Sequence, residues 1–268
     1  MFHEISESIN MTDMTRKIFK NLFLLYYKRF YGGKMLKAVI FDLDNTLYDY
    51  DINNEKAMNV VQNYVKSEFN IEEKKFFELY AEARKETHKI LNYNFASRHN
   101  RAIYFKRFLE KIEQKPYEYV NLLDDLYWNT ILDNMKLNSG VIELFELLKN
   151  NNIKIAISSN LLLSIQLKKI KKLGIGQYID YILTSEEIGT EKPSKLNFLN
   201  VLKYLKLKPN EVIFIGDDFN SDIVGAQNVG ILGILINKNI NEKCLCFKNF
   251  NDIFDYLKIH YIEHYKKP

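Results

Sequence analysis

Short apolar runs alternate with amphipathic stretches along most of the chain. Five runs are rich in β-branched or large apolar residues and end in polar loops: residues 36–41, 153–157, 181–184, 211–215 and 231–236. Apolar residues recur at helical spacing between these runs, at 140–149, 161–173 and 194–205, in a short segment that ends at 228, and at 252–259. Such runs are typical of buried parallel strands. The alternation predicts an α/β fold, a Rossmann-like doubly wound parallel sheet with helices on both faces.

Residues 52–137, between the first two predicted strands, show helical spacing only. Apolar residues there recur at a period of about 3.6, enough for about four helices, and Asn53 or Asn54 is the candidate cap of the first one. We therefore expect an inserted all-helical domain at 52–137. The core would be built from residues 35–51 and 138–268.

Residues 1–34 form a separate extension. Apolar residues between Ile18 and Tyr26 recur at helical spacing among basic residues, which predicts an amphipathic helix ended by Gly32-Gly33. Three interpretations are open: a packing helix or loosely ordered extension, translation that begins at Met35, or contact with a membrane surface. Stable membrane insertion is not expected, because the apolar run is far shorter than the roughly 20 residues that cross a bilayer.

The composition is that of an ordinary globular protein of 268 residues, with 47% hydrophobic and 27% charged residues. The formal net charge of +4 is spread along the chain, so we expect no nucleic-acid partner and at most a mild preference for anionic small molecules. The two cysteines, Cys244 and Cys246, are too few for a disulfide framework. They indicate free thiols in a reducing, cytoplasmic environment.

Polar residues follow the predicted strands where each strand ends. Asp42 and Asp44 follow the first strand, Ser159 the second, Lys192 comes after the third, and Asp217 to Asp222 follow the fourth. In a parallel α/β sheet these ends meet at one edge, which is where ligands bind. Carboxylates gathered there would repel one another without a cation, and hard oxygen ligands favour Mg²⁺. A hydroxyl and an ammonium beside that cation suit a phosphoryl group, and a carboxylate can attack phosphorus.

These residues form four ordered motifs that resemble those of the haloacid dehalogenase-like (HAD) hydrolase superfamily. The motifs are Asp42-Leu43-Asp44-Asn45-Thr46-Leu47, Ser159-Asn160, Glu191-Lys192-Pro193, and Gly216-Asp217 followed by Asp222. The match extends from Met35 to the last predicted helix. The resemblance implies a Mg²⁺-dependent hydrolase that works through an aspartyl-phosphate.

The resemblance also implies roles for the acidic residues. Asp42 would be the nucleophile and a metal ligand, and Asp44 the general acid and then base, with its backbone carbonyl toward the metal. Asp217 would be a further carboxylate ligand. Asp222 would support the metal from outside its ligand shell or orient the lysine, and Asp218 could share that work.

The remaining motif residues would act on the phosphoryl group. Ser159 would hydrogen-bond its oxygens with help from backbone N–H groups near Asn160, and Lys192 would neutralise both the phosphate and the nucleophile. Thr46 is expected to fix the turn. Singly, such residues are more often helix caps or solvated carboxylates, but jointly that interpretation is improbable.

Asp44 narrows the reaction, because family members that cleave carbon–halogen bonds lack a carboxylate there. An alkoxide that leaves a phosphate ester needs a proton, whereas a halide does not. We therefore expect a phosphomonoesterase. Phosphonate hydrolysis, phosphate migration within a sugar, and a non-enzymatic phospho-acceptor module are the less favoured alternatives.

The insert has the position and helical character of the family's C1 cap, a lid that sets specificity. The stretch 94–101 is rich in polar and basic residues, and Ser97, Arg98 and Arg101 are the candidate substrate contacts; capping and solvated side chains are the alternative. The chain resembles the branch with sugar-phosphate phosphatases, such as acylneuraminate 9-phosphatase, and pyrimidine nucleotidases. A phosphorylated sugar is the favoured substrate and a nucleoside 5'-monophosphate the alternative. We expect a monomer or a homodimer.

Overall fold

The computed structural model describes residues 35–91, 95–236 and 244–263. The predicted helix at 1–34 lies outside these ranges. Within them, no helix is both long enough and apolar enough to cross a membrane.

The described residues form a six-stranded parallel sheet with strand order β3-β2-β1-β4-β5-β6. Its strands are β1 (Ala38–Phe41), β2 (Lys154–Ser159), β3 (Tyr181–Thr184), β4 (Val212–Gly216), β5 (Leu232–Ile236) and β6 (Leu245–Phe247). The predicted doubly wound α/β fold is confirmed. The sequence pattern missed β6, because a three-residue edge strand is too short to produce a recognisable apolar run.

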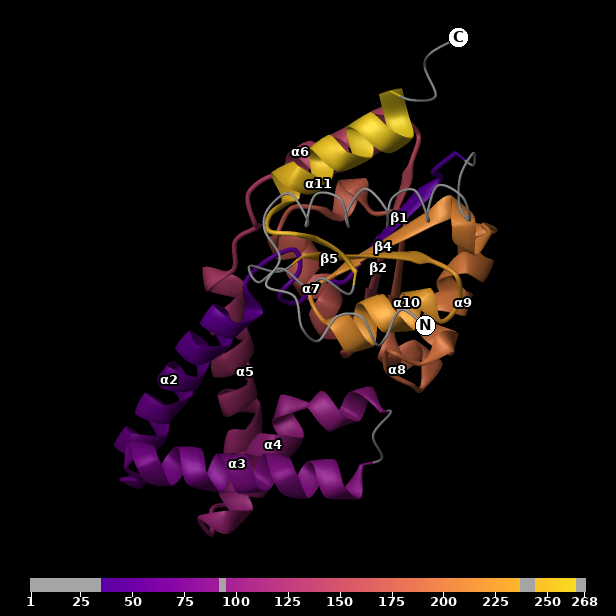
Figure 1. Cartoon of the computed structure of the whole chain (residues 1–268). Coiled ribbons are helices and arrows are strands. Elements are labelled where there is room, and N and C mark those ends of the chain that lie inside the picture. Colours follow the sequence, from indigo (N-terminus) through magenta and orange to yellow (C-terminus); the bar gives the residue numbers. More distant parts are fainter. Residues whose placement is uncertain (1–34, 92–94, 237–243, 264–268) are drawn as a thin grey trace, which may run out of the picture.

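Helices cover both faces of the sheet (Figure 1). Val39 and Phe41 point to the face covered by α6 (Val141–Asn150), α11 (Phe250–Leu257) and part of α7 (Leu163–Lys172). Ala38 and Ile40 point to the opposite face, which packs on α9 (Lys195–Leu205) and α10 (Gly225–Gln227). This burial on both sides explains why the first strand is continuously apolar and becomes polar only after its last residue.

The segment after β1 is helical and has its own apolar core. It contains α2 (Tyr50–Phe69), α3 (Glu73–Ile90), the 3₁₀ turn η1 (Ala96–His99), α4 (Arg101–Lys111) and α5 (Pro116–Asn134). These helices lie to one side of the sheet in Figure 1. Leu161 and Ile165, at the start of α7, join this second core, so the helical segment packs directly on α7.

The first helix of this segment begins earlier than its predicted caps. Asp49 is the N-cap, because its side chain accepts a hydrogen bond from the Ile52 N–H at 3.0 Å. The candidate cap Asn53 is instead buried in the first turn and donates to the Asp49 carbonyl. The prediction was wrong because the helix begins at Tyr50 and Asp49 caps its first turn.

Short elements complete the described fold. They are η2 (Gly176–Tyr178), α8 (Ser185–Ile188), η3 (Pro209–Glu211), the π-helical turn η4 (Phe219–Val224) and η5 (Lys258–Ile262). Two of them flank the candidate site: α8 precedes the Glu191-Lys192-Pro193 loop, and η4 follows Asp217 and Asp218.

Candidate active site

The site lies at the carboxyl edge of the central strand β1. Phe41 is in register with Ile157 of β2 and Ile215 of β4, so Asp42 emerges between the ends of both neighbours. The Asp42 N–H donates to the Ile215 carbonyl at 2.9 Å, which extends the β1–β4 ladder up to this residue. The loops after β1, β2 and β4 therefore meet around Asp42.

Lys192 joins two of the predicted carboxylates. Its ammonium lies 2.6 Å from Asp42 Oδ1 and 2.7 Å from Asp222 Oδ1. All three side chains are buried. Burial opposes ionisation of Lys192, but the charges of Asp222 and Asp42 outweigh it and raise the pKa of the lysine.

Thr46 links Asp42 to Asp217. Its buried hydroxyl lies 3.2 Å from Asp42 Oδ2 and 3.1 Å from Asp217 Oδ1, so its one hydrogen is shared between two carboxylates. The threonine therefore contacts both carboxylates directly, beyond the turn-fixing role expected from the sequence.

Asp42, Asp217 and Asp222 form an acidic group that could bind a metal. One oxygen atom from each lies within 4.8 Å of the others. Burial, with repulsion from Asp222 and Asp217, raises the pKa of Asp42 against the opposing attraction of Lys192. Burial and the charge of Asp222 raise the pKa of Asp217 to about 6. A divalent cation fits this group, because it would offset the repulsion that the protein leaves in place.

Asp218 and Asp222 have different roles at the start of η4. Asp218 Oδ1 caps this turn by accepting from the N–H groups of Asn220 and Ser221 at 2.8 and 2.7 Å. Asp222 Oδ2 accepts from the Asp218 N–H at 3.1 Å. A Cβ on Gly216 would lie 2.2 Å from Asp222 Oδ2, so the fold needs glycine there. Asp218 thus shapes the loop, while Asp222 faces Lys192.

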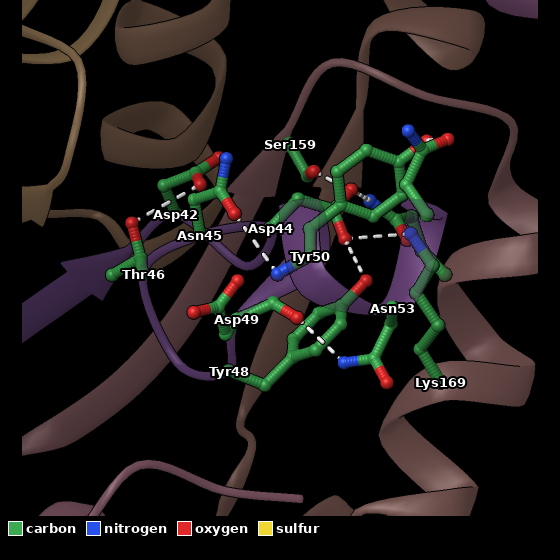
Figure 2. A network of polar contacts seen from close by, with 12 residues as sticks. Asp42, Asp44, Asn45, Thr46, Tyr48, Asp49, Tyr50, Asn53, Ser159 and Lys169 are labelled. Carbon is green, nitrogen blue, oxygen red and sulfur yellow. Dashed lines mark hydrogen bonds and ion pairs between the residues drawn. The ribbon is translucent and has the colours of Figure 1, made fainter. Parts of the chain in front are cut away.

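Asp44 lies in a second environment, on the other side of the loop from Asp42 and Thr46 (Figure 2). Its carboxylate accepts from Lys169 at 2.6 Å, from Gln166 at 3.0 Å and from the Tyr48 hydroxyl. Burial acts to raise the pKa of Asp44, but the Lys169 charge and these hydrogen bonds outweigh it and hold the pKa below its usual value.

Lys169 is a lysine with 0% exposure on α7. Its ammonium lies 5.3 to 5.8 Å from the ring centres of Tyr48, Tyr50 and Trp128. These aromatic faces and the Asp44 carboxylate together offset the loss of water around the charge.

Gln166 connects Asp44 to the predicted phosphoryl-binding serine. Its amide nitrogen donates to Ser159 Oγ at 2.6 Å as well as to Asp44 Oδ2. Asn160 instead binds the backbone of Lys192: its Oδ1 accepts from the Lys192 N–H at 2.8 Å and its Nδ2 donates to the Lys192 carbonyl at 3.2 Å. The Asn160 side chain therefore fixes the loop that carries Lys192.

The candidate cap residues lie in different places. Arg101 donates to the Tyr50 hydroxyl, to the Tyr127 hydroxyl at 3.1 Å and to the His99 carbonyl at 2.8 Å. Arg98 lines a cavity beside α3. Ser97 is half-buried, and its carbonyl accepts from the Asn100 N–H within η1. Arg98 and Arg101 both contact Tyr104.

Comparison with known proteins agrees with this geometry. The family model for the haloacid dehalogenase-like hydrolases matches residues 36–230, which include every motif residue described above. The chain belongs to the haloacid dehalogenase-like hydrolase family. The family resemblance inferred from the four motifs is confirmed.

Curated relatives of this hydrolase are named as phosphatases. A ribulose-1,5-bisphosphate 5-phosphatase of Halopiger xanaduensis is 37% identical over 203 residues, which cover 75% of this chain and 84% of the relative. A glyceraldehyde 3-phosphate phosphatase of Methanothermobacter thermautotrophicus is 30% identical over 212 residues, covering 78% of this chain and 88% of the relative.

Solved structures share the fold of this hydrolase. A 2-haloacid dehalogenase from Pseudomonas syringae pv. Tomato superposes with a TM-score of 0.67 at 20% identity, covering 84% of this chain and 99% of that one. At this identity the likeness shows the fold alone.

The sequence reasoning missed Gln166 and Lys169 as residues of the hydrolase's site, and it did not predict the contact between Tyr48 and Asp44. A signal for two of them was present, because Gln166 and Lys169 share the buried face of α7 with Ile165 and Ile170. A lysine at an apolar position of a helix calls for a buried partner. Tyr48 gave no comparable signal, since tyrosines are often buried by packing alone.

Proposed function

We propose that this hydrolase is a phosphomonoesterase that acts on a small phosphorylated sugar through a phosphoryl group on Asp42. The observation that carries the proposal is the separation of Asp42 and Asp44 into two environments. Asp42 lies with a lysine and an acidic group that fits a metal. Asp44 lies with hydrogen-bond donors and a second lysine. This separation supports attack on phosphorus by Asp42 and proton transfer by Asp44.

Mg²⁺ fits this acidic group. Asp42 and Asp217 would hold it through their carboxylates, the Asp44 backbone carbonyl would be a further ligand, and Asp222 would lie nearby. When bound, Mg²⁺ supplies the positive charge that lets an anionic nucleophile approach an anionic phosphoryl group. Thr46, shared between Asp42 and Asp217, fixes the relative orientation of their carboxylates.

In the first half-reaction a carboxylate oxygen of Asp42 attacks phosphorus and the bond to the substrate oxygen breaks. The leaving alkoxide takes a proton from Asp44 and departs as an alcohol. Lys192 stabilises the charge on the phosphoryl oxygens, and the Ser159 hydroxyl donates a hydrogen bond to one of them. Gln166, which donates to Ser159 Oγ, leaves the serine hydrogen available for this contact.

In the second half-reaction water attacks phosphorus, Asp44 takes its proton, and phosphate leaves while Asp42 is restored. The contacts with Lys169, Gln166 and Tyr48 favour the ionised form of Asp44, which is the form that this step needs. Proton donation in the first half-reaction requires the protonated form. The proposed mechanism therefore requires substrate binding to weaken the contact between Asp44 and Lys169.

The helical segment at 52–137 serves as a cap over the site, between core segments 35–51 and 138–268. Arg101 is the best candidate in it for a substrate contact. No carboxylate among the described residues forms an ion pair with its guanidinium, which instead contacts the hydroxyls of Tyr50 and Tyr127. Tyr50 in turn lies over Lys169, so Arg101 is close to the Asp44 side of the site. It would bind sugar hydroxyls or a second anionic group.

The substrate class is tested by phosphate release from a panel of phosphorylated sugars and nucleoside monophosphates, with Mg²⁺ and with Asp42→Asn as the inactive control. The relatives' substrates, ribulose 1,5-bisphosphate and glyceraldehyde 3-phosphate, belong in the panel. We expect the highest kcat/KM for a sugar phosphate. Faster turnover of a nucleoside monophosphate would make it the proposed substrate in place of a sugar phosphate. Phosphate release by Asp42→Asn would contradict the mechanism.

A further inference from the structure

A cavity of about 880 Å³ lies in the helical segment, lined by one face of α3 and by residues beyond its C-terminal end. Its walls include the cations of Arg84, Lys85, Lys89 and Arg98, together with the ring of His88. Among the described residues that line it, none is acidic and none belongs to the four sequence motifs. The volume is within the range of small-molecule sites, about 300–1,000 Å³.

The charges of α3 are separated between its two faces. Glu82 and Glu86 lie 3.4 and 2.6 Å from Lys111 of α4, away from the cavity. In the described part of the chain, Arg84, Lys85 and Lys89 form no ion pair with a carboxylate. Like charges one helical turn apart, as at positions 85 and 89, destabilise a helix. Glu86 offsets part of the charge of Lys89, and an anionic ligand in the cavity would offset the remaining positive charge.

His88 lines the cavity together with these cations. Its side chain is half-buried, whereas a histidine on a helix surface would be expected to be solvated. The Tyr104 hydroxyl donates to the Arg98 carbonyl, so it accepts from His88 Nε2–H at 2.8 Å. His88 Nδ1, which carries no hydrogen in this tautomer, is 3.4 Å from the Arg98 guanidinium. Burial, Arg98 and Arg84 lower the pKa of His88 to about 4. The ring is therefore neutral in a strongly positive surrounding.

We propose that this cavity binds a small organic molecule with two or more phosphoryl groups, at a site separate from the catalytic one. Two arginines offer planar, forked donors that match phosphate oxygens, and two lysines add point charges. The rings of Phe77 and Tyr80 supply an apolar wall for the organic part.

The cavity is connected to the catalytic loop. Arg98 is followed by His99, whose Nε2 lies 3.0 Å from the buried Glu191 Oε1. Glu191 immediately precedes Lys192, and η1 packs against α8 on the core. A ligand that moves Arg98 therefore displaces His99 against Glu191. We expect occupancy of the cavity to change kcat, and catalytic-site ligands to change affinity at the cavity in return.

The test is calorimetric titration of the full chain with the Mg²⁺ complex of tripolyphosphate, at equal free Mg²⁺ in cell and syringe, while Mg²⁺ and beryllofluoride occupy the catalytic site. We expect saturable binding, weakened about tenfold or more by Arg84→Ala/Lys89→Ala through the loss of two charge-assisted contacts. Lys75→Ala/Lys106→Ala is the matched control, since it removes two exposed cations of α3 and α4 that do not line the cavity. The affinity of this control variant for tripolyphosphate should change by less than about twofold, because screened surface charges contribute little to binding. Absence of binding, or equal loss in both variants, would overturn the proposal.

Two further measurements use the same probe. The pKa of the His88 ring, followed by NMR, should rise when tripolyphosphate binds, and an unchanged pKa at saturation would contradict the site. At saturating substrate, tripolyphosphate should alter kcat of the wild-type protein but not of Arg84→Ala/Lys89→Ala. Purely competitive inhibition that is identical in both proteins would place the probe at the catalytic site only and overturn the proposal.

Discussion

Asp42 and Asp44 are separated by one residue, yet their surroundings are opposite in charge. Asp42 faces two other carboxylates and one shared lysine, and its pKa is raised. Asp44 faces Lys169 and two neutral donors, with no second carboxylate among its described partners, and its pKa is lowered. The protein satisfies Asp44 with its own groups and leaves negative charge in excess around Asp42.

This difference indicates how the two carboxylates divide the chemistry. An excess of negative charge at Asp42 suits a group that works with a bound cation and approaches phosphorus. A carboxylate oriented by three hydrogen-bond donors suits proton transfer, because the donors hold it apart from the group that attacks phosphorus. Lys169 and Lys192 are thus not interchangeable, since each serves one of the two carboxylates.

The largest effect is expected for Asp42→Asn. The amide has nearly the same shape but cannot attack phosphorus, so kcat should fall by at least about 10³-fold for every substrate. Steady-state phosphate release from both a sugar phosphate and an aryl phosphate checks this. If the two substrates lost activity to different extents, Asp42 would not be the nucleophile common to both.

Asp44→Asn should have an effect that depends on the leaving group. For a sugar phosphate, loss of the proton donor should lower kcat/KM by about 10²–10⁴-fold. For p-nitrophenyl phosphate, whose leaving group needs no proton, the loss in kcat/KM should be much smaller. Equal losses for both substrates would show that Asp44 acts on position or metal binding and not on proton transfer.

Lys169→Met should lower both activity and stability. Removing one partner of a buried ion pair leaves Asp44 uncompensated, at a cost of about 3–5 kcal/mol in the free energy of unfolding. We expect kcat to fall by about tenfold or more while KM changes little. Lys172→Met is the matched control, because Lys172 lies on the same helix in an exposed pair with Asp133. Denaturant titration and kinetics of both variants check the prediction, which fails if they behave alike.

The smallest expected effect is the pH dependence of stabilisation by Mg²⁺. Asp217 has a folded-state pKa of about 6, above the usual aspartate value of 3.8, so without metal its contribution to stability falls as pH rises from about 4 to about 6. Mg²⁺ needs the ionised ligand. The rise in Tm on adding Mg²⁺ should therefore be larger at pH 7.5 than at pH 5, and smaller in Asp217→Asn. A pH-independent rise would remove Asp217 from the metal ligands.

Much of the fold followed from the sequence for one physical reason. Burial of the sheet on both faces makes strands such as Val212–Gly216 continuously apolar and places their polar residues after the last strand position. The motif residues Asp42, Lys192, Asp217 and Asp222 could be assigned to one edge on this basis. The edge strand Leu245–Phe247 could not, because it is short and pairs only with β5.

The partners of Asp44 could not be predicted, because they depend on how α7 packs between core and cap. Periodicity places Gln166 and Lys169 on the buried face of that helix but does not identify what they meet. Arg98 and Arg101 show the same limit in the cap. They lie three residues apart, yet one lines the cavity beside α3 and the other contacts Tyr50 and Tyr127.

The division of roles between Asp42 and Asp44 is tested most directly by trapping the phosphorylated protein. Asp44→Asn, mixed with Mg²⁺ and an aryl phosphate and quenched in acid, lacks the base that activates water and should accumulate one phosphoryl group per chain. Peptide mass spectrometry should locate that group on Asp42. Continued turnover without a covalent phosphoryl group, or a phosphoryl group on any other residue, would contradict the account.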